Sequence, residues 1–137
     1  MYSLKQKFKF TLDGPVKSIP CPVTVDGVRA VKIRWLYYQT SAPGEKEMQI
    51  RISELRGNGM EVSAGANAIS RYLLCIPLDQ NAFTTLTYSN YQQEMDAVYQ
   101  VPISTINELN FEIKINDVIA NQITSGNPIN LEIGFYE

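Results

Sequence analysis

Few side chains in this sequence are suited to catalysis. Its 137 residues include no histidine, so the commonest general base, neutral-pH switch and metal ligand is missing. Without histidine, a serine or threonine nucleophile would need a lysine of lowered pKa as its base, and no Ser-x-x-Lys motif occurs. The residue types therefore predict a protein that is not an enzyme and that uses no cofactor.

The cysteines are also poor candidates for chemistry. Cys21 and Cys75 lie far apart in the sequence, and Cys75 is inside the apolar run 72–78. A free cysteine in such a run behaves as a small apolar side chain. We expect two reduced thiols, with Cys75 buried.

The acidic residues could support two kinds of chemistry. A pair of glutamates could hydrolyse a glycosidic bond, but that mechanism depends on the distance between the carboxylates, and we favour solvated loop charges. The aspartates lie in predicted turns, where Asp bonds to nearby backbone N–H groups, and they form no calcium-loop motif. We expect no metal site, although calcium bound between separate loops stays an alternative. The two sets are Glu45, Glu47, Glu54 and Glu61, and Asp13, Asp26, Asp79, Asp96 and Asp117.

One glycine-rich segment resembles a phosphate-binding loop. Arg56-Gly57-Asn58-Gly59 lacks the Walker spacing, the following Lys-Ser/Thr and the start of a helix. We therefore favour an ordinary loop over a phosphate site.

Tyrosine is the residue type that points most clearly to binding. A tyrosine combines a large apolar area with one polar group, so exposed rings could stack on a sugar or form subunit contacts. Core packing is expected for about half of them. The candidates are Tyr37, Tyr38, Tyr88, Tyr91, Tyr99 and Tyr136.

The composition limits the class of protein. Hydrophobic residues make up 45% of the chain and charged residues 19%, which is typical of a folded domain. The net charge of −2 gives no basic surface for nucleic acid. There is no signal-peptide-like segment and no apolar run near the roughly 18 residues that span a bilayer. We expect a single domain, residues 1–137, made in the cytoplasm.

Alternating apolar and polar residues predict strands through most of the chain. In 107–116 and 128–136 every second residue is apolar, as in a strand with one buried face. In 28–38 the alternation places Trp35 inward, while Leu36 and Tyr38 make the outer face partly apolar. Three prolines predict an extended loop over 13–27, and residues 56–70 predict a long irregular connection. Eight strands without helices favour an all-β sandwich or barrel.

With eight strands and the terminal segments INELNFEIKIND and NPINLEIGFYE, the chain resembles the single jelly-roll capsid proteins of icosahedral double-stranded DNA viruses. It resembles in particular the penton or minor capsid proteins of virophages and polinton-like viruses. The resemblance implies an antiparallel β-sandwich with sheets BIDG and CHEF, in which the first strand pairs with the last. Strands B to I would then lie at about 3–12, 28–38, 47–55, 71–78, 83–88, 96–101, 107–116 and 128–136.

The resemblance also implies a structural role in the virion. Such proteins form fivefold rings at capsid vertices, so we expect a homo-pentamer that contacts a neighbouring major capsid protein. The chain has no basic N-terminal arm or long C-terminal extension, so anchoring through tails is not expected, and it could be a trimmed fragment. The alternative is a β-sandwich module that binds carbohydrate or a receptor. The expected subunit contacts are Leu36, Tyr38, Tyr91 and Met95.

Overall fold

The computed structural model describes residues 1–62, 69–78, 81, 83–90 and 94–137, and these residues form an all-β, antiparallel structure without helices. The prediction of an all-β protein is confirmed. The strands are β1 (Leu4–Leu12), β2 (Val16–Gln39), β3 (Glu47–Ile52), β4 (Gly59–Val62), β5 (Ile69–Tyr72), β6 (Leu74–Pro77), β7 (Thr85–Ser89), β8 (Ala97–Ile115), β9 (Val118–Ile119) and β10 (Ile129–Tyr136).

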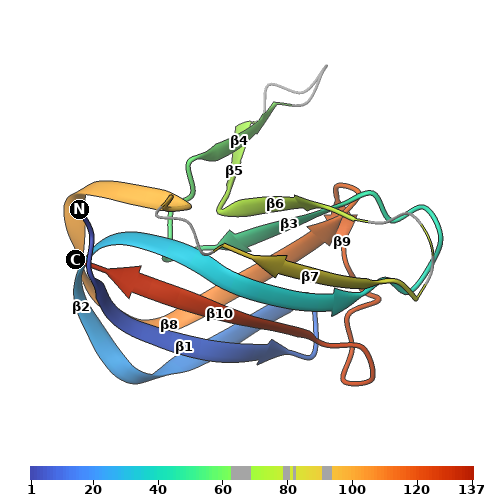
Figure 1. The fold of residues 1–137 in the computed structure, drawn as a ribbon, viewed down its shortest axis with the longest axis horizontal. Coiled ribbons are helices and arrows are strands. Elements are labelled where there is room, and N and C mark those ends of the chain that lie inside the picture. The colour runs from blue at the N-terminus through green and yellow to red at the C-terminus, as the bar shows by residue number, and fades with distance from the viewer. Residues whose placement is uncertain (63–68, 79–80, 82, 91–93) are drawn as a thin grey trace.

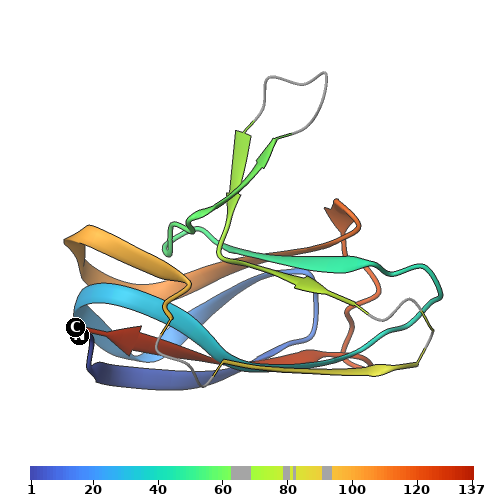
Figure 2. The same cartoon turned by 45° about the horizontal axis from the view of Figure 1, so that its top comes forward.

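The strands form one curled sheet that closes over itself in two layers. The sheet order is β1-β10-β2-β8-β3-β6, with β7 paired to β2 and β9 paired to β8. Figure 1 and Figure 2 show β1, β10, β7 and the second half of β2 in one layer, and β8, β3, β6 and the first half of β2 in the other. This arrangement is consistent with a β-sandwich.

Two long strands connect the layers. The first part of β2 pairs with the end of β8, as in Val16 opposite Glu112, whereas its last part pairs with β10 and β7. The β4–β5 hairpin forms a separate two-stranded sheet that projects from the sandwich (Figure 2).

Several predicted boundaries are wrong because the prolines do not end the strands. The predicted loop 13–27 is mostly β2, and Pro20 and Pro22 lie where the pairing with β8 is interrupted, between Pro20 and Val25. Pro102 lies in the irregular part of the ladder opposite 28–30, so 96–101 and 107–116 join into one strand, β8. Proline disrupts a ladder only where its N–H is needed, and at these positions it is not. The predicted irregular segment 56–70 contains β4 and the start of β5.

The predicted pairing of the first and last strands is confirmed. β1 runs antiparallel to β10, with Phe8 opposite Ile133 and Phe10 opposite Leu131. The other strand neighbours that the resemblance implies are wrong. Range 47–55 is expected as strand D beside the last strand, 128–136, but in the structure this range contains β3, which lies between β8 and β6. Range 28–38 pairs with β10 and β7 instead of 107–116.

The core lies between the layers and follows the predicted alternation closely. The ring centroids of Phe10 and Phe111, from opposite layers, are 5.3 Å apart. Burial of each large apolar side chain contributes about 1.5–3 kcal/mol, so this set supplies the main stabilising term. The predicted inward residues that are buried are Phe8, Phe10, Leu12, Val31, Ile33, Phe111, Ile113, Ile129, Leu131, Ile133 and Phe135.

The alternation of β2 reverses at Arg34. Trp35 is opposite Glu132 and Ile33 is opposite the next residue, Ile133, so Arg34 is the extra residue of a β-bulge. One extra residue moves all later side chains to the opposite face. The predicted outward orientation of Leu36 and Tyr38 is therefore wrong: both are 0% exposed, and Trp35 is only half-buried.

Candidate functional site

The thiols are held in their protonated form. Cys21 and Cys75 are free and half-buried. Burial raises the pKa of Cys21, and burial together with the Glu47 carboxylate raises the pKa of Cys75 to about 11. Because the thiolate is the nucleophile, neither cysteine is activated for chemistry near neutral pH.

The glutamates considered for hydrolysis are each bound by donors of neighbouring strands or loops. Glu54 accepts a hydrogen bond from the backbone N–H of Asn110 at 2.6 Å. Glu61, on the projecting hairpin, lies 3.1 Å from a guanidinium nitrogen of Arg51 and accepts a bond from Gln49 at 2.9 Å. The contacts of Glu61 hold the hairpin base against β3, and the contact of Glu54 joins the turn after β3 to β8, so both carboxylates have a structural use.

Glu45 is the centre of a buried polar network. Glu45 is only 4% exposed. Its carboxylate accepts hydrogen bonds from the Tyr38 hydroxyl at 3.1 Å, the Ser41 hydroxyl at 2.9 Å and the Gln122 amide at 3.0 Å. Burial, and then the nearby carboxylate, raise the pKa of Tyr38 above its usual range. The network fastens the end of β2 to the loop between β9 and β10.

A second charged cluster lies on the outer face of the layer that contains β10. Asp96 accepts a hydrogen bond of 2.6 Å from the backbone N–H of Ile33, next to the bulge. Burial raises the pKa of Asp96 to about 6, against the lowering effects of that hydrogen bond and of Lys32. Lys32 is buried and lies over the Tyr136 ring, with 5.6 Å from Nζ to the centroid. The nearby Arg34 pairs with Glu132 at 3.5 Å.

The remaining aspartates occupy separate places. Asp13 pairs with Lys17 at 2.9 Å, and Asp26 accepts a hydrogen bond from the Thr105 hydroxyl at 3.3 Å. Asp117 lies in the β8–β9 turn with φ 64°, and Asp79 is outside the described residues. Among the described residues, no group of three or more His, Cys, Asp or Glu side chains could hold a metal ion.

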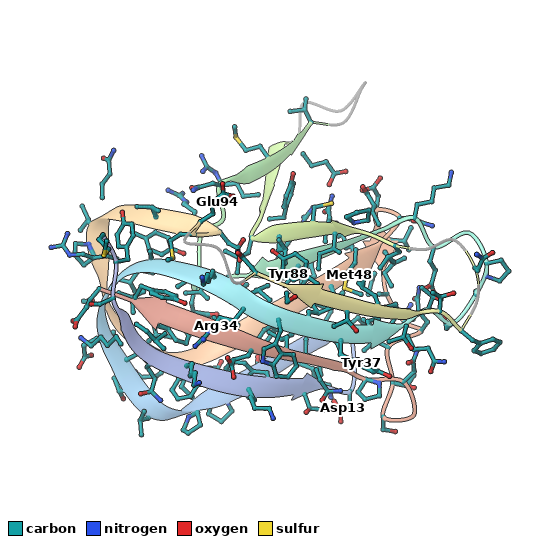
Figure 3. The ribbon with its side chains drawn as sticks, viewed as in Figure 1. Asp13, Arg34, Tyr37, Met48, Tyr88 and Glu94 are labelled. Atoms are coloured by element: carbon teal, nitrogen blue, oxygen red, sulfur yellow. The ribbon has the colours of Figure 1, made fainter. Side chains whose placement is uncertain are left out.

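Most of the tyrosines considered for stacking are at least partly buried. Tyr38 and Tyr136 are buried and Tyr88 and Tyr99 half-buried, whereas Tyr37 is 44% exposed. Tyr37 lies beyond Arg34 along β2 (Figure 3). The nearby Trp35 has the Lys9 ammonium 5.6 Å from its ring centroid. Among the candidate tyrosines that the structure describes, which excludes Tyr91, Tyr37 is therefore the one that offers an open ring.

The predicted subunit contacts do not form one surface. Leu36 and Tyr38 are in the core, and Tyr91 lies outside the described residues. Met95 is half-buried and lines a cavity of about 210 Å³ with Met1, Tyr2, Lys32 and Tyr136. Of the four, Met95 is the one described residue that reaches the surface.

The glycine-rich segment Arg56 to Gly59 has a packing function. A Cβ on Gly57 would lie 1.9 Å from the Tyr72 carbonyl oxygen, and one on Gly59 would lie 2.2 Å from the Tyr72 ring. Only glycine allows the chain to pass this closely. The segment therefore runs directly against β5 instead of forming a phosphate loop before a helix.

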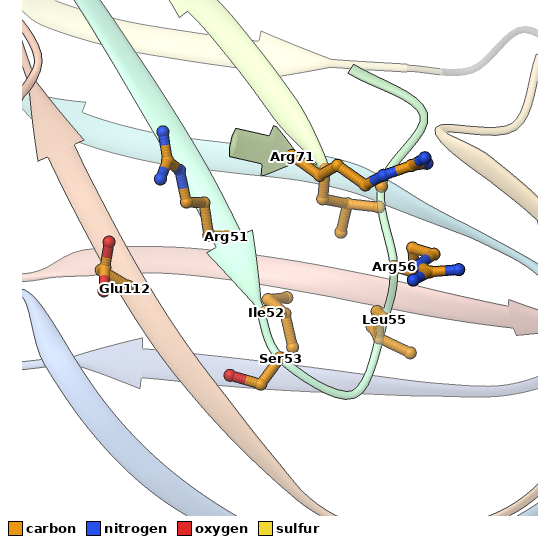
Figure 4. A pocket seen from close by; sticks show the side chains of 9 residues that line it. Arg51, Ile52, Ser53, Leu55, Arg56, Arg71 and Glu112 are labelled. Atoms are coloured by element: carbon orange, nitrogen blue, oxygen red, sulfur yellow. The ribbon is translucent and has the colours of Figure 1, made fainter. Parts of the chain in front are cut away.

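This close approach helps to form a cavity of about 350 Å³ at the hairpin base, which we call the arginine cavity (Figure 4). Arg56 and Arg71 are exposed and extend to the same side in Figure 4, whereas Arg51 lies apart from them beside Glu112. Sequence reasoning missed this cavity, since Arg56 and Arg71 are brought together only by the folding of the hairpin. The lining includes Arg51, Arg56, Arg71 and Glu112, and the apolar Ile52, Leu55 and Leu73.

Comparison of the chain with protein-family models and with curated proteins finds no match. No helix in the described part of the chain is long and apolar enough to cross a membrane.

Proposed function

We propose that this chain is a non-enzymatic structural subunit of an icosahedral viral shell, a penton or minor capsid protein with the jelly-roll fold. It works in the virion as a homo-pentamer beside a neighbouring major capsid protein. The observation that carries the proposal is the order of the strands.

The strand order supports a jelly roll once the two halves of β2 are counted separately. One layer then reads β1, β10, second half of β2, β7, which is the order B-I-D-G. The other reads first half of β2, β8, β3, β6, which is the order C-H-E-F. In this assignment strand C is the proline-containing segment 16–25, and strand D is the stretch that contains the bulge at Arg34.

The state of the reactive side chains supports a non-enzymatic role. The thiols are protonated, and the buried carboxylate Glu45 has its oxygens occupied by hydroxyl and amide donors. The Glu45 network joins the end of β2 to the loop between β9 and β10, at one end of the sandwich. A loop fastened by buried hydrogen bonds suits a subunit that must meet its neighbours in a fixed orientation.

Light scattering over a concentration series tests the assembly. We expect a mass above the 15.5 kDa of one chain that approaches five copies as the concentration rises. Met95→Lys should lower the mass by placing a charge at the proposed contact, whereas Met60→Lys, at an exposed position on the hairpin, serves as the matched control. A monomer at all concentrations, or equal masses for the two variants, would contradict this arrangement.

A carbohydrate- or receptor-binding module is the second candidate function, and the exposed ring of Tyr37 beside Trp35 favours it. Aromatic rings on a sheet face are suited to stacking on sugars. A glycan array distinguishes the two proposals. Binding that is lost in Tyr37→Ala and kept in Tyr72→Ala would favour the module, and an array without binding would remove it.

A further inference from the structure

We propose that the arginine cavity binds a short acidic peptide segment of a partner protein, with carboxylates on Arg56 and Arg71 and an apolar side chain on the cavity floor. The inference does not depend on the capsid role, because it rests on the charges and shape of this cavity alone.

Of the three arginines that line the cavity, one is paired with a carboxylate of the protein and two have no such partner among the described residues. Arg51 lies 3.1 Å from Glu61 and 2.8 Å from the Gln49 amide oxygen, so its charge is already neutralised within the protein. Arg56 and Arg71 are exposed, and neither has an ion-pair partner among the described residues. A guanidinium binds a carboxylate through two parallel hydrogen bonds, so two guanidinium groups that line one cavity suit two carboxylates of one short segment.

The floor of the cavity favours a peptide over a small inorganic anion. Ile52, Leu55 and Leu73 contribute apolar lining, and the volume of about 350 Å³ is large enough for one apolar side chain with its backbone. Sulfate or phosphate would leave this apolar part unused.

The two arginines are held in place by backbone packing. Gly57 follows Arg56 and lies against the backbone of Tyr72 and Leu73, and Tyr72 follows Arg71. Because the backbone at both positions is fixed in this way, the ordering cost of binding comes mainly from the exposed arginine side chains themselves.

A protein segment also fits the overall electrostatics better than a nucleic acid. The chain carries a net charge of −2, so it lacks the extended basic surface that a polyphosphate requires. Two local cations within an acidic molecule select a short anionic segment.

Fluorescence anisotropy with a fluorescein-labelled peptide Glu-Asp-Leu-Glu-Asp tests the proposal, with Gln-Asn-Leu-Gln-Asn as the neutral control peptide. We expect saturable binding of the acidic peptide alone, weakened by raising the salt concentration. Arg56→Gln with Arg71→Gln should weaken binding at least about tenfold, because each lost bidentate guanidinium–carboxylate pair costs roughly threefold or more, in the upper half of the range for exposed ion pairs. Arg29→Gln with Lys46→Gln removes two exposed charges elsewhere and should change affinity less than about twofold.

The double lysine variant, Arg56→Lys with Arg71→Lys, keeps both charges but removes the bidentate guanidinium groups. It should bind the acidic peptide more weakly than the natural chain and more tightly than the double glutamine variant, with an unchanged thermal midpoint. Equal affinity for both peptides, equal affinity of the two glutamine double variants, or no saturation at millimolar protein would overturn the proposal. A further test is whether sodium sulfate displaces the peptide more strongly than sodium chloride does at equal ionic strength. That result would show a simple anion site and would overturn the proposed peptide specificity.

Discussion

Replacing Asp96 with asparagine should stabilise the protein at neutral pH. The carboxyl group accepts a 2.6 Å hydrogen bond from the backbone N–H of Ile33 and lies near Lys32. Burial nevertheless dominates and raises its pKa from 3.8 to about 6. An asparagine amide oxygen can accept the same hydrogen bond without placing a charge there.

The size of the effect follows from the difference in proton affinity. The folded protein binds this proton more tightly than the unfolded chain, so the stabilisation is fully present below about pH 4 and is lost as the pH rises through about 6. Each tenfold change in proton affinity corresponds to about 1.36 kcal/mol, so a pKa raised from 3.8 to about 6 lowers the free energy of unfolding at neutral pH by about 3 kcal/mol at most. We expect Asp96→Asn to be more stable than the natural chain by about 1–3 kcal/mol at pH 7.5 and equally stable at pH 4.

Urea unfolding at intervals from pH 4 to 7.5 measures this difference. Asp13→Asn is the matched control, since the pKa of Asp13 is lowered by a hydrogen bond and an ion pair with Lys17 at an exposed position, so its removal should give no gain at pH 7.5. A pH-independent difference between Asp96→Asn and the natural chain, or a loss of stability at pH 7.5, would refute the reasoning.

Three further substitutions test the packing by urea unfolding. Phe111→Ala should cost about 3–5 kcal/mol, because this ring contacts Phe10 across the layers; a loss below about 1 kcal/mol would mean that the layers are not packed there. Gly57→Ala should cost about 1–3 kcal/mol because its Cβ would meet the Tyr72 backbone, whereas Gly126→Ala, with only a contact at 3.8 Å, should be nearly neutral. Tyr38→Phe should cost about 1–3 kcal/mol because Glu45 loses a buried donor, while Tyr37→Phe should change little; equal effects would contradict the network.

The period-two pattern was sufficient to predict the parts of the fold that depend on a continuous strand. Residues 107–116 and 128–136 alternate without interruption, and their apolar residues are buried as expected. The pairing of β1 with β10 was expected from the resemblance to jelly-roll capsid proteins and not from the alternation, because an apolar face on each strand does not by itself select a partner.

The errors in the predicted strands arise where one residue changes the pairing register or interrupts the ladder. Nothing in the sequence around Arg34 marks a bulge, yet the bulge reverses the orientation of Leu36 and Tyr38 and turns two expected contact residues into core. The prolines of 13–27 suggested a loop because their missing N–H groups disfavour a central ladder, but a ladder with an interruption accommodates them.

The candidate binding residues were harder to predict than the core. Arg56 and Arg71 are separated by the whole hairpin, and their juxtaposition depends on the contact between Gly57 and the Tyr72 backbone. The glycines of Arg56-Gly57-Asn58-Gly59 indicate a close approach of the chain, but a sequence cannot show which backbone they must approach. Buried polar groups such as Glu45 and Asp96 look like ordinary turn residues until their hydrogen-bond partners are known.

Native mass spectrometry of the purified chain tests the proposed structural role most directly, because it counts the copies in each assembly. We expect a dominant species of five times the 15.5 kDa chain, which dissociates to monomers without other stable intermediates. A monomer at every concentration, or a closed assembly with a different number of copies, would contradict the proposal of a fivefold vertex subunit.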